Sequence, residues 1–233
     1  YFKTAQSLRV PTGTLRSYAL GINDSGEVVG AAQLSTTSCA LRWATTTSAP
    51  TCLSFSYEAF GQLSGINASG KAVGAKIGDG TSDIVGYTHT RGAHAVTYLT
   101  TDGIPLAINK LNWLSGMDAR IWRPNGTSFT LSVLCPNGQT PVHTELYDLN
   151  QDVSVVGSLQ CEAEGYVAFR WVHGANVTQY LGLEMHDPTL IMEVATGISE
   201  YGHIVGTGWH FEDGEWVERG WLLTRVTSIA AVQ

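Results

Sequence analysis

The sequence predicts an all-β fold, specifically a five-bladed β-propeller of four-stranded antiparallel blades. The first observation is that a phrase of the form Gly-Ile-Asn-x-x-Gly-x-Val-Val-Gly recurs along the chain. Its period, about forty residues, is typical of an array built from one supersecondary unit. The second observation is that each period holds four short apolar or aromatic segments separated by turn residues. Four-stranded units of this length are typical of propeller blades.

The phrase is clearest where it starts at Gly21, Gly65 and Gly197, and two copies that match it only in part cover residues 108–116 and 149–157. Because the copies extend over nearly the whole chain, we expect a single closed domain over residues 1–233. The five repeats are expected near residues 17–55, 62–99, 104–134, 145–181 and 194–224.

Within each repeat the phrase predicts a β-hairpin. In the first copy, residues 17–22 are mostly apolar, residues 23–26 read Asn-Asp-Ser-Gly, and residues 27–30 begin a returning strand. Asn and Asp side chains hydrogen-bond the backbone of a tight turn, and glycine adopts positive φ there without steric cost.

The last residue of this turn should therefore have positive φ in every regular copy. The glycines concerned are Gly26, Gly70 and Gly202, and Asn112 takes their place in the third copy. Asn is the best substitute for glycine at positive φ. Val153 stands there in the fourth copy, so we expect a different turn in that repeat.

The third and fourth strands follow from apolar segments after each hairpin. Third strands are expected at residues 40–43, 84–87, 119–122, 168–171 and 219–222, and fourth strands at 51–55, 95–99, 128–131 and 176–181. The fifth repeat has no obvious fourth strand. Residues 225–232 or the N-terminal residues 6–10 could supply it, and we favour the N-terminal segment because it would tie the ring shut.

The four cysteines predict two disulfides, Cys39–Cys52 and Cys135–Cys161. They lack the short paired spacing of a zinc ribbon, and their even number in a chain poor in lysine is typical of an oxidising compartment. The blade register places the members of each pair close together. Four free buried thiols are the alternative.

Charge excludes several functions. Charged residues make up 14% of the chain and the net charge is −7, which argues against a nucleic-acid partner and against an anionic membrane surface. No apolar run reaches the roughly 20 residues of a membrane span, so membrane insertion is not expected. We expect a secreted or cell-surface protein whose signal peptide precedes this numbering.

The hairpin phrase, followed by a strand such as Ala168-Phe169-Arg170-Trp171, resembles the HAF repeats of bacterial extracellular proteins. The His of the His-Ala-Phe segment that names those repeats is absent here. The resemblance covers roughly residues 17–224. It implies a β-rich secreted or surface protein, and it carries over no catalytic residues.

The candidate binding site lies in two irregular loops, residues 182–193 and 207–218. Loops that depart from a repeat on a rigid scaffold are common places for function. Their acids and aromatics suit carbohydrate, because rings stack on sugar faces and carboxylates accept hydrogen bonds from hydroxyls. The candidate ligand-binding residues are Glu184, His186, Asp187, Trp209, His210 and Trp216.

The alternative for these loops is a long polar hairpin with packed aromatics. The odd spacing of Trp209 and Trp216 would then send the two rings to opposite strand faces. Which description holds is open at this stage.

A second candidate function is a polysaccharide hydrolase or lyase with a carboxylate site at the channel mouth. Glycoside hydrolysis needs two facing carboxylates, and the expected inner strands offer Glu145 and Asp148 in one repeat, with Glu193 beside the inner strand of another. A third candidate is a structural subunit that self-assembles outside the cell. No cofactor and no metal site are predicted, although His143, His186 and His210 fall in loops of the same expected face.

Overall fold

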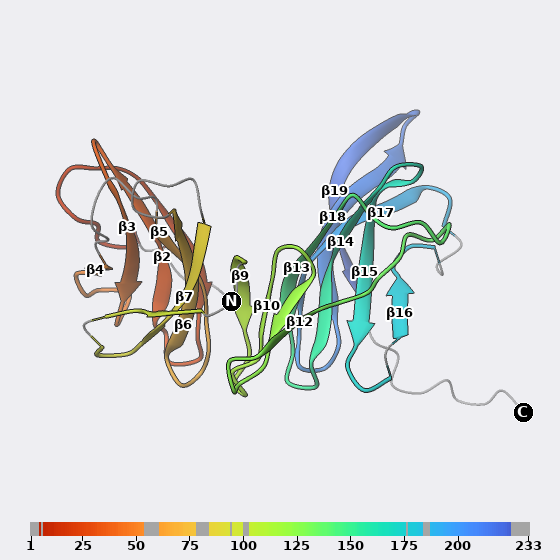
Figure 1. The fold of residues 1–233 in the computed structure, drawn as a ribbon. Coiled ribbons are helices and arrows are strands. Elements are labelled where there is room, and N and C mark those ends of the chain that lie inside the picture. Colours follow the sequence, from red (N-terminus) through yellow and green to blue (C-terminus); the bar gives the residue numbers. More distant parts are fainter. Residues whose placement is uncertain are drawn as a thin grey trace, which may run out of the picture. The chain divides into compact units, whose positions relative to one another are not determined.

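The computed structural model describes residues 5, 7–53, 61–77, 84–93, 95–99, 103–175, 177–183 and 187–224. Within these residues all regular structure is β-strand, and five antiparallel sheets are formed, four of them four-stranded (Figure 1). The prediction of an all-β fold of four-stranded antiparallel units is therefore confirmed. No helix in the described ranges is long and apolar enough to cross a membrane.

Each sheet is made of strands that follow one another in the chain. The first holds β1 (Thr14–Ile22), β2 (Val28–Leu34), β3 (Ser38–Trp43) and β4 (Thr51–Leu53). The second holds β5 (Gly61–Ile66), β6 (Lys71–Ile77), β7 (Ile84–Thr90) and β8 (Thr97–Tyr98). The third holds β9 (Pro105–Ile108), β10 (Leu114–Gly116), β11 (Arg120–Trp122) and β12 (Ser128–Thr130).

The last two sheets are built from longer strands. The fourth holds β13 (His143–Leu149), β14 (Ser154–Cys161), β15 (Gly165–Val172) and β16 (Val177–Tyr180). The fifth holds β17 (Leu190–Ile198), β18 (Ile204–Glu212) and β19 (Glu215–Leu223). By contacts, the chain divides into two compact units, residues 1–116 with 120–129, and residues 117–119 with 130–233.

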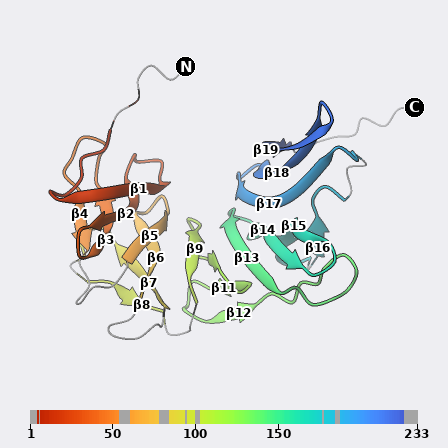
Figure 2. The same ribbon diagram turned by 90° about the horizontal axis from the view of Figure 1, so that it is seen from above.

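Sheets stack within each unit. In the first unit β5 contacts β1, β2 and β3, and in the second β17 contacts β13, β14 and β15 (Figure 2). Buried apolar side chains from both sheets fill each contact. Those in the first unit are Val29 and Ala40 against Leu63, Ile66 and Tyr87, and those in the second are Val156 and Ala168 against Met192, Ala195 and Trp221.

The hairpin turn has one geometry in all five repeats. In the first, the Gly26 amide donates to the Asn23 carbonyl at 2.9 Å, and the Glu27 amide donates to Asn23 Oδ1 at 3.0 Å. The same two bonds recur around Asn67, Asn109 and Asn150, and Ser199 replaces the amide oxygen with its hydroxyl oxygen. The asparagine of the phrase therefore acts as an acceptor inside the turn, a role that a serine hydroxyl can also take.

Positive φ is confirmed at the last turn residue. The φ angles are +77° at Gly26, +79° at Gly70, +81° at Gly202 and +64° at Asn112.

The expectation of a different turn in the fourth repeat is wrong. Val153 has φ +54°, and its amide donates to the Asn150 carbonyl as in the other copies. A β-branched residue at positive φ is strained. Val153 is also buried, so the turn's hydrogen bonds and the apolar contacts of this side chain offset the local backbone preference.

Gly70→Val should lower the free energy of unfolding by more than about 1 kcal/mol, the usual scale of such backbone strain. A Cβ there would also lie 2.9 Å from Arg91 Nε and 3.0 Å from Glu27 Oε2, whereas a Cβ on Gly26 would meet nothing within 4 Å. Gly26→Val is therefore the matched control for the backbone cost alone. Urea unfolding of both variants checks this, and an equal loss would show that crowding contributes nothing.

The closing glycine of the phrase faces a β-bulge in the preceding strand. In the first sheet the register shifts between Ala19 and Gly21, opposite Gly30. A Cβ on Gly30 would overlap the Tyr18 carbonyl, and Gly74, Gly116, Gly157 and Gly206 stand in the same relation to their own first strands. These glycines are needed for close approach of the backbones.

Both predicted disulfides are present, Cys39–Cys52 and Cys135–Cys161. No cysteine of the chain is free. The first links neighbouring strands β3 and β4 of one sheet. The second ties the segment after β12 to the end of β14.

Within each unit, one sheet has a face on which apolar side chains are exposed, the first sheet in the first unit and the fifth sheet in the second. Ile22 on β1 is 67% exposed, whereas its counterparts Ile66 and Ile198 are 9% and 8% exposed. On the fifth sheet Val205 is 45% exposed, whereas its counterpart Val29 is fully buried. An apolar side chain in the same repeat position is thus buried only where another sheet lies on it.

Neither candidate for a fourth strand of the fifth sheet is a strand in the described residues. Residues 7–10 have no strand assignment, and Gln6 and residues 225–232 lie outside the described ranges. Closure of a ring stays a prediction.

Candidate functional site

One cavity of the second unit, about 370 Å³, lies among strands of the fourth and fifth sheets. This volume is in the range of small-molecule sites. The cavity is lined by His143, Glu145, Tyr147, Ser158, Gln160, Tyr166, Glu193, Val194, Thr207 and Glu218.

The fourth sheet supplies two rows of these side chains. His143 pairs with Gln160, and Gln160 pairs with Tyr166, so the three form one row across β13, β14 and β15. Glu145 pairs with Ser158 in the next row. Residues directly opposite one another in a sheet share a face, which is why positions far apart in the sequence meet at one wall.

Two β-bulges bring further polar side chains to the cavity. The register of β13 shifts between Leu146 and Asp148, which leaves Tyr147 as the additional residue, and the register of β17 shifts between Met192 and Val194, which leaves Glu193. Bulges re-aim side chains and are enriched beside active sites. Sequence alternation already groups Tyr147 with His143 and Glu145, whereas Glu193 and Val194 are adjacent in the sequence and yet both line the cavity.

Tyr147 is held against Glu145, because its hydroxyl donates a short hydrogen bond to Glu145 Oε2. Burial, together with the hydrogen bond and the negative charge of Glu145, raises the pKa of Tyr147 to about 12. The phenol therefore stays protonated at neutral pH and is a fixed donor that orients the carboxylate.

The cavity is electronegative. Glu145, Glu193 and Glu218 lie on its walls, and among the described residues that line it none is lysine or arginine. Such a site favours hydroxyl donors and cations over anionic ligands.

Asp148, the third predicted inner-strand acid, has a structural role. Its Oδ2 accepts from the Ile198 amide at 2.9 Å and its Oδ1 from the Leu149 amide at 2.8 Å, so it links β13 to β17. Burial raises its pKa to about 6, although these two hydrogen bonds act in the opposite direction.

Protonation of Asp148 should therefore make stability depend on pH. Between its unfolded pKa of 3.8 and its folded pKa of about 6, the folded chain holds a proton that the unfolded chain has lost. The free energy of unfolding should fall as pH rises through this window, by on the order of 2 kcal/mol. Urea unfolding of the wild type and Asp148→Asn at pH 4 and pH 7 measures this, and parallel pH profiles would contradict it.

The structure separates the sequence-predicted ligand residues onto different faces. Trp209, Phe211 and Trp216 share one face of the β18–β19 hairpin, because Phe211 pairs with Trp216 and Trp209 lies two residues before Phe211. All three are between 37% and 45% exposed, and the Phe211 and Trp216 rings lie 5.3 Å apart.

The expectation that Trp209 and Trp216 point to opposite faces is wrong. Odd spacing predicts opposite faces only along one strand. Here the turn at Asp213 and Gly214 separates two paired strands. The face of a residue on the second strand is therefore set by its partner on the first strand, not by its sequence distance from Trp209.

His210 and Asp187 belong to a hydrogen-bonded network that is separate from the aromatic face of Trp209 and Trp216. Asp187 Oδ1 accepts from the Thr189 hydroxyl at 2.6 Å, and that hydroxyl lies 3.3 Å from His210 Nε2. His210 Nδ1 lies 2.8 Å from Glu212 Oε1, and Arg219 donates to the same carboxylate. The hydrogen bonds from Thr189 lower the pKa of Asp187, and those from His210 and Arg219 lower that of Glu212. Glu184 and His186 lie outside the described residues.

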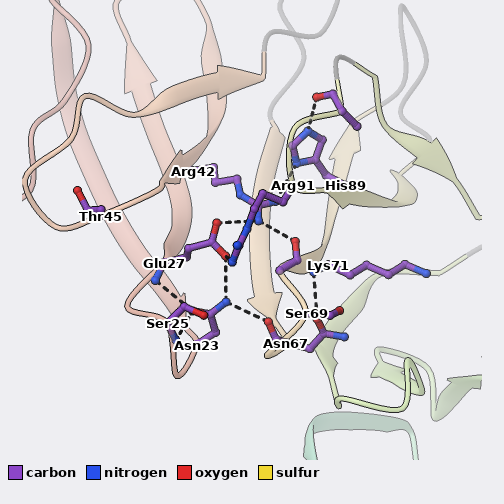
Figure 3. A network of polar contacts seen from close by, with 12 residues as sticks. Asn23, Ser25, Glu27, Arg42, Thr45, Asn67, Ser69, Lys71, His89 and Arg91 are labelled. Atoms are coloured by element: carbon purple, nitrogen blue, oxygen red, sulfur yellow. Dashed lines mark hydrogen bonds and ion pairs between the residues drawn. The ribbon is translucent and has the colours of Figure 1, made fainter.

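A charged network occupies the first unit (Figure 3). Glu27 and Arg42, 3% and 5% exposed, form an ion pair at 3.1 Å, and Arg91 forms a short second ion pair with Glu27. Arg42 also donates to the Gly70 carbonyl at 2.7 Å. Burial alone would raise the pKa of Glu27, but hydrogen bonds from Arg91, Arg42 and Asn23 outweigh it and lower the pKa.

His89 completes this network. Its Nδ1 lies 3.3 Å from Arg42 Nη1 and its Nε2 lies 3.0 Å from the Ala93 carbonyl. An arginine can only donate, so Nδ1 accepts and Nε2 carries the proton. Burial lowers the pKa of His89, and the charge of Arg42 acts in the same direction. The polar groups of this network satisfy one another, which identifies it as a link between the first two sheets.

Within the described part of the chain, one group of three metal-ligand side chains is close enough to share an ion, namely Cys135, Cys161 and Glu164. Two of these residues form a disulfide, so the group does not offer thiolate ligands.

No protein-family model matches this chain, and no curated protein is significantly similar to it.

Proposed function

We propose that this chain is an extracellular five-bladed β-propeller that binds carbohydrate in the cavity of its second unit. The proposed ligand class is inferred from the cavity lined by Glu145, Tyr147 and Glu193. The proposed propeller is inferred from the five repeats and from the exposed apolar faces of the first and fifth sheets.

Leu8 supports closure by the N-terminal segment. In three repeats a leucine at the end of, or just after, the fourth strand packs on the apolar cluster of the following sheet; these are Leu53, Leu99 and Leu181. Leu8 packs in the same way on the cluster that holds Trp43, and Trp43 Nε1 donates to the Arg9 carbonyl at 2.6 Å. The N-terminal segment thus has the contacts of a fourth strand that precedes the first sheet.

Closure of a ring would bury the exposed apolar faces of the first and fifth sheets. Exposed apolar side chains gather on β1 and on the β17–β19 sheet, among them Leu15, Ile22, Val205 and Leu222. In a five-membered ring each sheet would be covered on both sides, and burial of such a face is favourable at about 25 cal/mol per Å².

Solution scattering tests the ring. A closed monomer of 233 residues should have a radius of gyration of about 17 Å. A larger radius at monomeric mass would contradict closure, and assembly of several copies would favour the structural-subunit alternative.

The extracellular location rests on the disulfides. Two disulfides are compatible with an oxidising compartment. The resemblance of the hairpin phrase to HAF repeats points in the same direction.

The ligand class follows from the cavity's chemistry. A sugar offers hydroxyl donors to Glu145 and Glu193 and an apolar ring face to an aromatic side chain such as Tyr166. Because the lining holds three carboxylates and no lysine or arginine, neutral or amino-bearing sugars should be preferred over uronates and sulfated sugars.

A binding screen tests this proposal. Isothermal titration with glucosamine oligomers, neutral glucans and polygalacturonate should show binding of the first two classes. Glu145→Gln should weaken binding at least about tenfold, the scale of a lost hydrogen bond to a charged group. Glu162→Gln, on an exposed residue outside the cavity, is the matched control. Binding of polygalacturonate alone, or equal affinities of the two variants, would overturn the proposal.

A hydrolase at the same cavity is the second candidate. Glu145 and Glu193 line one cavity, and Tyr147 orients the first of them, so two carboxylates are available for glycoside hydrolysis. Release of reducing ends from the oligomers that bind would favour the enzyme, and binding without release would favour the binding module.

A further inference from the structure

The carbohydrate cavity has a neighbour in the same unit. A second cavity, of about 440 Å³, is lined by residues 118–119, 130–134 and 140–144. His143, the first residue of β13, lines both cavities and is exposed. One side chain is thus part of the lining of both cavities.

The second cavity combines apolar and hydroxyl-bearing side chains. Leu134 and Val142 are 45% and 51% exposed, and Thr130, Ser132 and Thr140 add hydroxyls. Six of the twelve residues that line this cavity are apolar and six are polar, and small-molecule sites combine both kinds of group. This combination matches the apolar face and polar edge of a sugar ring.

Charge is the same in both cavities. Asp118 in the second adds to Glu145, Glu193 and Glu218 in the first, and no lysine or arginine lines either one. A ligand that spans both cavities would thus meet acceptors and negative charge along its whole length. A polymer with regularly placed amino groups complements that pattern.

We propose that the bound carbohydrate is an amino-bearing oligosaccharide that runs from the first cavity, past His143, into the second. This inference rests on the proposed carbohydrate function. It adds a second subsite, and it makes chain length a determinant of affinity.

The experiment compares oligomer lengths. Isothermal titration with the glucosamine dimer and hexamer should give an affinity for the hexamer at least tenfold higher than for the dimer. Asp118→Asn should reduce hexamer affinity severalfold and leave dimer affinity unchanged. Glu145→Gln should weaken binding of both, because the first subsite is shared.

The matched control is Asp213→Asn. Asp118 and Asp213 both have positive φ, +56° and +51°, and asparagine accepts this conformation. Asp213 is exposed at the β18–β19 turn and lines neither cavity. Leu134→Ala gives a second, uncharged test of the same subsite, with the same expected loss for the hexamer alone.

The outcomes separate the two proposals. Equal affinities for dimer and hexamer, or an Asp118→Asn effect no larger than that of Asp213→Asn, would overturn the second subsite and leave the first cavity in place. Absence of binding by every oligomer would overturn the carbohydrate function itself, and the second subsite with it.

Discussion

Arg42→Met should lower the free energy of unfolding by about 3 kcal/mol or more, the usual cost of removing one member of a buried ion pair. Arg42 neutralises Glu27 at 3.1 Å and also donates to the Gly70 carbonyl. Methionine fills similar space but provides no donor. The Glu27 carboxylate, 3% exposed, would keep only its contacts to Arg91 and Asn23.

Arg91→Met is the control for this prediction. Arg91 contacts the same carboxylate, but its side chain is 54% exposed, so water can take part of its place when it is removed, and the expected loss is smaller than for Arg42→Met. Urea unfolding should therefore separate the two variants clearly.

A double variant tests the cause. Glu27→Gln combined with Arg42→Met should be more stable than Arg42→Met alone, because a neutral amide costs less to bury than an unpaired carboxylate. Equal losses for the two arginine variants, or no recovery in the double variant, would show that the buried charge is not the source of the effect.

The hairpin illustrates what the sequence predicts well. Asn23, Gly26 and their counterparts act through bonds inside a five-residue segment, so local chemistry alone predicts the turn. Val153 marks the limit of that reasoning. Its positive φ is maintained by the same turn bonds and by burial, and burial is not visible in a local pattern.

The candidate site was predictable only in part. The sequence identifies Glu145 on an inner strand and Glu193 beside another, and it misses Tyr147, Tyr166 and Glu218. Glu193 occupies a bulge in β17, which interrupts the alternation that assigns side chains to faces, whereas Tyr147 keeps the alternation of His143 and Glu145. Gly157, whose Cβ would overlap the Glu145 carbonyl, is the one signal in the sequence that marks the bulge in β13.

Trp209 and Trp216 also show that the sequence alone does not assign loop residues to the correct face of a sheet. They are exposed, as a ligand-binding role requires. However, they lie on the opposite face of their sheet from His210, which belongs to the hydrogen-bonded network of Asp187 and Thr189. Adjacent positions along a strand face opposite ways. A loop-based list of residues therefore merged two surfaces that the hairpin separates.

Loss of the Cys135–Cys161 disulfide should cost about 3 kcal/mol of unfolding free energy, and loss of Cys39–Cys52 about 0.6 kcal/mol less. The sequence separations are 26 and 13. A cross-link that closes a longer loop removes more entropy from the unfolded chain. Each doubling of the loop length increases the stabilisation by about 0.6 kcal/mol. Denaturant unfolding of the two double-alanine variants measures both losses, and a greater loss for Cys39–Cys52 would contradict this entropic explanation.

The longer disulfide should also affect the second subsite. It anchors the segment that carries Leu134, next to the turn in which the Gly138 amide donates to the Cys135 carbonyl. The Tyr180 hydroxyl also donates to this segment, to the Leu134 carbonyl at 2.9 Å and to the Cys135 carbonyl at 3.5 Å. With the disulfide removed, hydrogen bonds hold the wall of the cavity less rigidly than the covalent link, so hexamer affinity should fall severalfold while dimer affinity stays constant. The Cys39/Cys52 double-alanine variant, altered in the first unit, should bind both oligomers as the wild type does. Equal hexamer affinities in the two variants would show that the wall keeps its shape without the cross-link.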